Sequence, residues 1–466
     1  MAYILPFKGI IYNSEKIKDI RDVVAPPYDV ISPEEQDRLY KRHKNNVVRL
    51  ILGKDSENDE PANNRYMRAR DYLESWQRDS ILIKDNFPSI YIYAQEYHMG
   101  EAEGFEKKKR VGFIALSKLE DFGEGDIHPH ENTLSKPKED RLMLIQACNT
   151  NFSPIFGLFT DKTKRIDSVF NDYMRQPPLY DLIDGAGVRH TLWAISEKRV
   201  IEIIIKEMAD KQIFIADGHH RYETAINYRN EIRKKSPTPP SPSLQGGRVR
   251  DEDKPYNFVM MYFTNTVSEG LSILPIHRLV SNLSNFDKKK IVEKAGEFFN
   301  IEKLSFNESD EKAIRKRLFS DMKERGEKEH IFGMYLGDDD YILLTLKEGG
   351  QGSGVRGQEE VTSKQYGVGS KQLKKLDVTI LHTLLIEKVL GISEKNLAEQ
   401  KNITYTINTR EAIKGVKDSK YHMALFLNPT RIEDVQAVAT TGEKMPQKST
   451  FFYPKLITGL VMNKLE

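Results

Sequence analysis

The chain has 466 residues, of which 39% are hydrophobic and 30% are charged, and its formal net charge is +2. This length suits two or three globular units, or one large elaborated unit. The balance of 71 basic against 69 acidic residues argues against a dedicated nucleic-acid binder, although it allows one local basic pocket. The single cysteine, Cys148, excludes an intramolecular disulfide and a zinc site built from cysteines.

The N-terminal stretch MAYILPFKGIIYNSEKIKDI contains a lysine at Lys8 and no long apolar core. We therefore expect it to be neither a signal peptide nor a membrane-spanning helix. Later apolar stretches such as IEIIIKEM are interrupted by charge, and none reaches the roughly 20 apolar residues that cross a bilayer. Together with the single cysteine, this pattern predicts a protein of the reducing cytoplasm that has no membrane partner.

The hydrophobic patterns predict helices and strands that alternate along the chain. Helical spacing of apolar residues predicts a helix within 61–80, and enrichment in β-branched and aromatic residues predicts a long hairpin from 88–97 and 110–119. The later predictions, in chain order, are a helix at 196–210 opened by Ser196, a buried strand at 211–218, a helix at 220–235, strands at 255–266 and 340–346, a helix at 376–391 closed by Gly391, and a strand at 420–429. This interleaved order predicts an α+β (mixed α/β) fold.

Two segments differ in composition from the rest of the chain. Residues 236–255 are rich in proline, serine and glycine, and residues 347–371 are similar. Such segments bury too little apolar surface to offset the entropy of ordering, so both are interpreted as flexible insertions in surface loops. The first insertion divides the chain into an N-terminal α+β region, 1–235, and a C-terminal α+β region, 256–466.

The stretch FIADGHHRYETA carries the strongest candidate site. It predicts a strand, a glycine turn at Gly218 and the start of a helix, where free backbone N–H groups and the helix dipole favour an anion. Gly218 lets the backbone approach a ligand, and His219, His220 and Arg221 add donors, so the stretch predicts a phosphate site. Asp217 beside it could bind a metal ion, accept a proton from a hydroxyl, or cap the helix.

A second cluster, EGDIHPHENTLSKPKEDRLMLI, contains His130, Glu131, Lys136 and Arg141. One interpretation is a further phosphate contact, in which the basic side chains neutralise charge. A second is a metal site, because His-X-His together with His219 and His220 would supply four imidazoles. A solvated charged loop is the third.

The stretch TGEKMPQKSTFFYPKLITGL places Lys448, Ser449, Thr450 and Lys455 among aromatic residues near the C-terminus. A lysine followed by hydroxyl residues resembles the end of a phosphate loop, but the glycine-rich lead of a Walker motif is absent. A basic turn near a ligand and an aromatic packing segment both remain open. Near the N-terminus, Pro26 and Pro27 stiffen a loop that contains Tyr28 and Asp29, and this rigid backbone could line a pocket.

The blocks APPYDVIS, HPHENTLSKPKEDRL, SPIFGLF, IADGHHRYETA, LPIHRLV and MPQKSTFFYPKLITGL resemble, in this order, those of the uncharacterised bacterial and archaeal family called domain of unknown function 1015. They cover nearly the whole chain. The strand-DGHHR-helix element also resembles the Gly-X-X-Arg box of the ParB/sulfiredoxin-like superfamily. That resemblance implies that Gly218, His219, His220 and Arg221 hold a nucleotide phosphate. Sulfiredoxins have a catalytic cysteine in this box, whereas His219 and His220 stand in the middle here, which argues against sulfinate repair.

These observations favour a phosphotransferase that uses a nucleotide, ATP or ADP, with Mg²⁺, and acts on the hydroxyl of a small metabolite. Free serine as the acceptor is implied by one member of the superfamily, an archaeal kinase. In this hypothesis Asp217, Glu131 and His130 are catalytic, and Lys136, Arg141, Lys448 and Ser449 assist the phosphate-binding box. The alternatives are a ParB-like regulatory nucleotide-binding protein and a histidine-ligated metal-dependent phosphoester hydrolase.

Overall fold

The computed structural model describes residues 2–99, 106–133, 135–235, 251–347, 370–393, 396–397 and 401–465. It divides into two compact units. Unit 1 comprises Met1–Pro129, Thr133–Ser272 and Pro454–Glu466, and unit 2 comprises His130–Asn132 and Ile273–Tyr453. Both units combine helices with a sheet, which confirms the predicted α+β fold class.

Unit 1 is built on a mixed sheet of nine strands. The strands lie in the order β6 (Ile127–His128), β11 (Ile213–Asp217), β8 (Ile155–Phe159), β12 (Phe258–Asn265), β5 (Glu106–Lys118), β4 (Ile90–Met99), β10 (Arg189–Ile195) and β9 (Tyr180–Ile183), and β1 (Ile4–Leu5) also pairs with β5. The antiparallel pairing of β4 with β5 confirms the predicted hairpin. Strands β8 and β12 are buried along their whole length, as expected for a sheet covered on both faces.

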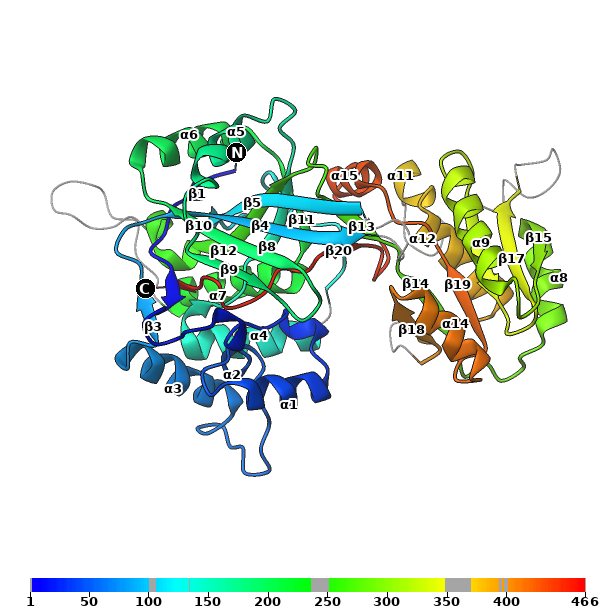
Figure 1. Cartoon of the computed structure of the whole chain (residues 1–466), viewed down its shortest axis with the longest axis horizontal. Helices are drawn as coiled ribbons and strands as arrows, with labels where there is room; N and C mark the ends of the chain where they lie inside the picture. The colour runs from blue at the N-terminus through cyan, green and yellow to red at the C-terminus, as the bar shows by residue number, and fades with distance from the viewer. Residues whose placement is uncertain are drawn as a thin grey trace. The chain divides into compact units, whose positions relative to one another are not determined.

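Helices cover both faces of this sheet (Figure 1). On one side lie α1 (Pro33–Arg42), α2 (Val48–Ile51), α3 (Arg65–Arg78) and α4 (Ser135–Cys148), and on the other lie α5 (Arg165–Tyr173) and α6 (Lys198–Met208). Helix α7 (His219–Lys235) packs against α4 and buries Tyr222, Ala225 and Ile226 in the same apolar cluster as the sheet. Short elements complete the unit: η1 (Ile20–Asp22), η2 (Tyr28–Val30), η3 (Asp251–Asp253), η4 (Pro255–Asn257), β2 (Ile10–Tyr12), β3 (Leu82–Lys84), β7 (Thr150–Asn151) and β21 (Asn463–Lys464).

Unit 2 has its own six-stranded sheet, in the order β15 (Phe299–Ser305), β17 (Asp340–Leu346), β16 (Ile331–Tyr335), β19 (Met423–Phe426), β14 (His277–Val280) and β18 (Ile403–Thr406). Alternate residues of β17 serve two cores, because side chains of a strand point to opposite faces. Ile342 and Leu344 join one cluster, and Tyr341 and Leu343 join the other. The remaining elements are α8 (Lys288–Phe298), α9 (Glu311–Arg325), α11 (Lys371–Lys374), α12 (Asp377–Ile380), η5 (Leu381–Val389), α14 (Thr409–Lys417), α15 (Ile432–Thr440), β13 (Ser272–Leu274) and β20 (Phe451–Tyr453).

The boundary between the units differs from the division expected at residues 236–255. Unit 1 continues to Ser272 because β12 lies in the middle of its sheet, between β8 and β5. The chain also returns to unit 1 at Pro454, where β21 pairs with β7. Sequence patterns identify strands, but long-range pairing decides which sheet a strand joins.

The expected insertions fall largely outside the described residues, which exclude 236–250 and 348–369. Residues 251–255, at the end of the first predicted insertion, correct that prediction because they are bonded to the fold. Asp251 accepts a hydrogen bond from the hydroxyl of Tyr256 at 2.5 Å, and its carbonyl oxygen accepts one from the side chain of Asn257 at 2.5 Å. Helix α6 is a second correction: its N-cap is Glu197 rather than Ser196, and no side chain caps it. The sequence predicts that Gly391 closes the helix at 376–391. It follows η5 with a φ of +70°, the left-handed conformation that a helix-closing glycine adopts.

Within the described ranges, no helix combines the length and the apolar composition that a bilayer crossing requires. Cys148 is a buried free thiol, and burial raises its pKa to about 12.

Tyr222 provides a test of how α7 is fixed to the sheet. Its hydroxyl accepts a hydrogen bond from the backbone N–H of Glu120 at 3.0 Å and donates to the carbonyl oxygen of Glu120 at 3.1 Å. We expect Tyr222→Phe to lower the stability of unit 1 by about 1–3 kcal/mol, because a buried backbone N–H loses its acceptor. Urea unfolding followed by tryptophan fluorescence measures this, since Trp76 and Trp193 both belong to unit 1.

Tyr3→Phe is the matched control, because the Tyr3 hydroxyl has no hydrogen-bond partner within the described residues. Equal midpoints for the two variants would contradict the anchoring role of Tyr222.

Candidate functional site

The candidate site begins where β11 passes into α7. The register of β11 against β8 shifts between Ile215 and Asp217, and such a bulge changes the direction of the side chains that follow. Gly218 then adopts a φ of +93°, which disfavours any residue with a Cβ. The carbonyl oxygen of Gly218 accepts the first helical hydrogen bond, from the N–H of Tyr222 at 3.0 Å. The predicted strand, glycine turn and helix start are therefore all present.

One carboxylate at this turn binds two cations. Oδ2 of Asp217 accepts a hydrogen bond from Nη2 of Arg221 at 3.0 Å, and Oδ1 accepts one from Nζ of Lys455 at 2.5 Å. The three side chains are 19%, 15% and 17% exposed, respectively, so the ion pairs are mostly shielded from water. Arg221 also donates to the carbonyl oxygen of Pro154 at 2.5 Å. Together these three charged groups carry one excess positive charge.

The electrostatics of the turn keep Asp217 ionised. Burial by itself would raise the pKa of Asp217, but the charges of Lys455 and Arg221 outweigh it and hold that pKa well below its usual range. A carboxylate with so low a pKa is a weak proton acceptor near neutral pH. The geometry therefore favours Asp217 as the group that orients Arg221 and Lys455, rather than as the proton acceptor expected from the sequence.

Lys455 reaches Asp217 because a buried network holds the segment that carries it. Nε2 of Gln95 on β4 donates to the carbonyl oxygen of Lys455 at 2.9 Å. The guanidinium of Arg110 on β5 donates to the carbonyl oxygen of Pro454 at 2.5 Å and also to Gln95. Arg110 is fully buried, with its guanidinium 4.6 Å from the centre of the Phe156 ring. The central sheet thus fixes the position of a residue near the C-terminus.

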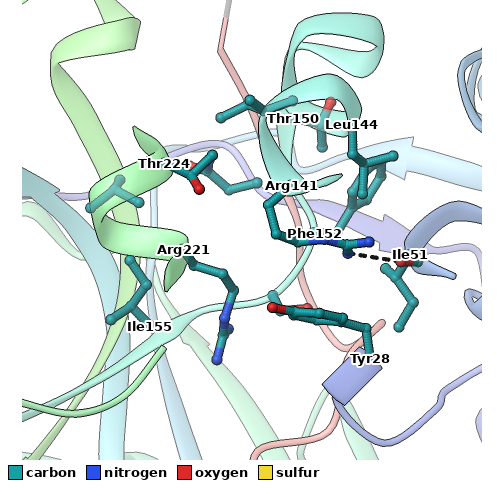
Figure 2. Close-up of a pocket in the computed structure, with 13 residues that line it drawn as sticks. Tyr28, Ile51, Arg141, Leu144, Thr150, Phe152, Ile155, Arg221 and Thr224 are labelled. Atoms are coloured by element: carbon teal, nitrogen blue, oxygen red, sulfur yellow. Dashed lines mark hydrogen bonds between the residues drawn. The ribbon is translucent and has the colours of Figure 1, made fainter. Parts of the chain in front are cut away.

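A cavity of about 60 Å³ lies next to Arg221. Figure 2 shows that Arg221 from α7, Arg141 from α4 and Tyr28 from η2 converge on it. The guanidinium of Arg141 lies 3.9 Å from the centre of the Tyr28 ring, and the hydroxyl end of that ring is turned toward Arg221. A volume of this size has room for a few water molecules or one phosphate-sized group, but not for a whole nucleotide.

Burial raises the pKa of the Tyr28 hydroxyl, and the charges of Arg141 and Arg221 oppose that rise. Arg141 itself is largely committed to the protein. It donates to Asp140 at 2.7 Å and to the carbonyl oxygen of Ile51 at 2.8 Å. Its direct role as a phosphate ligand is therefore weaker than the sequence predicted, whereas its contact with Tyr28 helps to shape the cavity.

The other predicted residues of unit 1 differ in accessibility. His219 is buried, with 4% of its surface exposed, and its charge contributes to lowering the pKa of Asp217. His220 is half-buried, and Lys136 is exposed in the first turn of α4. The imidazole pair is thus split, with one ring turned inward and the other partly open.

The remaining predicted residues belong to unit 2. Glu131 accepts a hydrogen bond from the backbone N–H of Lys448 at 3.1 Å, and Nε2 of His130 lies 3.0 Å from Oγ1 of Thr450. Ser449 is buried and donates to the carbonyl oxygen of Pro446 at 2.5 Å, while Lys448 adopts a φ of +58°. The second and third sequence clusters are therefore joined through residues 130–132, whereas Lys136 and Arg141 lie in unit 1.

Among the residues that the structure describes, no three histidine, cysteine, aspartate or glutamate side chains lie close enough together to hold a metal ion. The structure therefore offers no ligand set for the predicted metal site within those residues. Both Asp217 oxygens are occupied by cationic partners, and the ring of His128 stacks on Phe214 at 5.4 Å.

Sequence reasoning placed Lys455 in a basic turn that could lie near a ligand and Tyr28 in a loop that could line a pocket, but it connected neither residue with Asp217 or Arg221. Both lie in blocks that carried the family resemblance, MPQKSTFFYPKLITGL and APPYDVIS. The two segments run side by side, since the backbone of Ala25 exchanges hydrogen bonds of 3.1 and 2.8 Å with Thr458. The order of the blocks could have directed attention to them, but nothing local in the sequence pairs Lys455 with Asp217.

A model of the family described as protein of unknown function (DUF1015) matches residues 4–379. No curated protein matches the chain.

Several solved structures share a weak likeness with the chain. "Free serine kinase in complex with AMP" is 11% identical, with a TM-score of 0.32 over 70% of this chain and 83% of that one. A conserved hypothetical protein from Pyrococcus furiosus is 12% identical, with a TM-score of 0.32 over 73% and 92%. SbnI with C-terminal truncation from Staphylococcus aureus is 10% identical, with a TM-score of 0.33 over 75% and 86%. Scores this low support no argument about function, and the likeness of the Gly218–Arg221 box to ParB and sulfiredoxin proteins stays a prediction.

Gly218 is expected to tolerate no side chain. A Cβ at this position would lie 2.9–3.1 Å from the guanidinium atoms of Arg221, and the φ of +93° already disfavours it. We expect Gly218→Ala to destabilise unit 1 by about 1–3 kcal/mol and to displace Arg221. Tryptophan-detected urea unfolding measures the change, with Gly185→Ala in the open β9–β10 turn as control. Equal effects of both substitutions would contradict a special role for Gly218.

Asp217 should give stability a defined pH dependence. Its pKa is lower in the folded chain than in the unfolded chain, so its contribution is complete above the unfolded pKa of about 3.9 and is lost as the pH falls below it. We expect Asp217→Asn to cost about 3–5 kcal/mol near neutral pH, because two shielded cations lose their partner. The difference from wild type should shrink in acid.

Urea midpoints measured across that pH range test this dependence, with Asp210→Asn as the control at an exposed carboxylate. A difference between wild type and Asp217→Asn that stayed constant into acid would show that the charge of Asp217 does not carry the stabilisation.

Proposed function

The chain belongs to the family of proteins of unknown function DUF1015, and we propose that its unit 1 binds a nucleotide phosphate at the amino end of α7. The observation that carries the proposal is the pair of cations, Arg221 and Lys455, that Asp217 holds beside the glycine turn. We propose further that the protein is a phosphotransferase that moves a phosphoryl group from ATP or ADP to the hydroxyl of a small metabolite.

Several features of the turn suit an anion. The charged groups carry one excess positive charge, and the amino end of α7 adds the positive end of the helix dipole. The cavity beside Arg221 has the size of a phosphate group, so the remainder of a nucleotide would extend out of it. The ion pairs with Asp217 fix both cations before a ligand arrives, which lowers the cost of ordering them.

Phosphoryl transfer depends mainly on positioning and on compensation of developing negative charge. In this proposal Arg221 and Lys455 bind phosphate oxygens, Asp217 orients both side chains, and Tyr28 lines the same cavity as Arg221. The nucleotide supplies the transferable phosphoryl group, and Mg²⁺ would accompany the nucleotide. No described residue is assigned to Mg²⁺, because the oxygens of Asp217 are bound by Arg221 and Lys455.

The other unit 1 assignments from the sequence enter as parts of the same proposal. Gly218, His219 and His220 belong to the phosphate-binding turn, and Lys136 adds positive charge on α4. The catalytic roles of His130 and Glu131 and the phosphate-binding roles of Lys448 and Ser449 stay predictions from the sequence, because all four residues belong to unit 2 and the site proposed in unit 1 does not use them. Free serine is the proposed acceptor on the strength of the superfamily resemblance, and the cytoplasm is the proposed location.

Nucleotide binding tests the first part of the proposal. We expect ATP or ADP to bind wild-type protein in calorimetry and Lys455→Met to weaken that binding about tenfold to a hundredfold, because a charged donor is lost. Lys455→Met leaves the Arg221–Asp217 pair in place, so it separates ligand binding from folding. Lys206→Met, at an exposed lysine of α6, serves as the control.

Absence of binding by both nucleotides, or equal affinity of the Lys455→Met and wild-type proteins, would contradict the phosphate site. A turnover assay with serine and other small hydroxyl compounds then tests transfer. Binding without any turnover would leave the regulatory alternative in place of the kinase.

A further inference from the structure

Unit 1 contains a second and larger cavity, of about 620 Å³, that shares no lining residue with the cavity beside Arg221. Its walls come from η1, from α1, from the backbone at 24–26 and from the turn between β9 and β10. Cavities that bind small molecules in proteins typically have volumes of about 300–1,000 Å³. This cavity therefore has the size of a metabolite site.

Two arginines face this cavity from one side of α1. Arg38 and Arg42 are four residues apart, so both guanidinium groups lie on the same helix face. Neither forms an ion pair with a carboxylate of the described residues, whereas the third arginine of the cavity, Arg21, is bound by Asp19. Arg42 also donates a hydrogen bond to the carbonyl oxygen of Arg21 at 3.5 Å. Two guanidinium groups at one wall of a concave surface favour a ligand with an anionic group, and the carboxylates of Asp22, Glu35 and Asp184 line the same cavity.

The wall formed by the turn between β9 and β10 is held in place by buried side chains. Oδ1 of Asp184 accepts hydrogen bonds from the N–H groups of Ala186 and Val188 at 2.8 and 2.9 Å. Oδ2 of Asp184 lies 3.0 Å from Nε2 of His190, a fully buried residue whose Nδ1 lies 2.7 Å from the hydroxyl of Tyr93. The oxygens of Asp184 are thus committed to the turn, and they shape the cavity instead of binding a ligand.

Apolar and acidic groups define the rest of the cavity. Val24, Ala25 and Leu39 are buried side chains that provide an apolar surface. Glu35 lies on α1 one turn before Arg38 and lines the same cavity, so its carboxylate can accept hydrogen bonds from hydroxyl groups of a ligand. An anion that also carries a hydroxyl group matches this set of side chains.

We propose that this cavity is a binding site for a small hydroxylated metabolite, whose carboxylate or phosphate group binds Arg38 and Arg42 and whose hydroxyl binds Glu35. The site is independent of the nucleotide site proposed for Arg221 and Lys455. Carboxylate and phosphate share the oxygen geometry that guanidinium groups recognise, so the probes of the experiment distinguish them.

Calorimetry with four probes, malate, succinate, glycerol 3-phosphate and inorganic phosphate, tests the site. Malate differs from succinate by one hydroxyl, and glycerol 3-phosphate differs from phosphate by its hydroxylated carbon chain. We expect one hydroxylated probe to bind more tightly than its partner. The double variant Arg38→Gln and Arg42→Gln should weaken that binding at least about tenfold, because charge-assisted hydrogen bonds are lost.

Two further variants separate the roles of the side chains. Glu35→Gln should reduce the preference for the hydroxylated probe, and Lys455→Met should leave its affinity unchanged. Arg199→Gln, at an exposed arginine of α6, is the control for loss of a surface charge. The proposal is overturned if no probe binds, if the double arginine variant binds as wild type does, or if Lys455→Met abolishes the binding.

Discussion

The two ion pairs of Asp217 organise the candidate site, because they connect three parts of the chain that are separate in sequence. Asp217 ends β11, Arg221 lies in the first turn of α7, and Lys455 lies in the returning C-terminal segment. Two mostly buried cations would be costly without their shared carboxylate. The same arrangement leaves positive charge at a helix start, which suits an anion. The stability of this turn and the proposed phosphate binding therefore depend on one carboxylate.

Two residues of the unit 1 sheet hold the segment that carries Lys455. Arg110 and Gln95 occupy neighbouring strands and bind the carbonyl oxygens of Pro454 and Lys455. Arg110 is an arginine without solvent contact, and its aromatic and carbonyl neighbours replace water around the guanidinium. Buried polar groups of this kind specify a single position for the segment they hold. The lysine at the site is thus placed by the core of the fold and not by its local sequence.

Local features of the site were predictable from the sequence, and distant ones were not. The strand, the glycine turn and the helix start follow from hydrophobic periodicity and from Gly218, and the structure contains all three. Lys455 could not be paired with Asp217, because 238 positions separate them and no local pattern encodes that contact. His130 and Glu131 illustrate the same limit, since residues 130–132 leave unit 1 for a bridge with Met445. The low pKa of Asp217 also depends on partners that only the fold supplies.

The return of the chain to unit 1 at Pro454 has a consequence for biosynthesis. Unit 2 is inserted into unit 1, so a ribosome makes all of unit 2 before it makes Lys455. The sheet and α7 can form on the nascent chain, but the second cation of the site and the pairing of β21 with β7 arrive last. Until then Asp217 has only Arg221 as a described ion-pair partner, and the apolar side chains that receive Met462 lack their cover. Synthesis itself therefore sets the order in which the two ion pairs of Asp217 form.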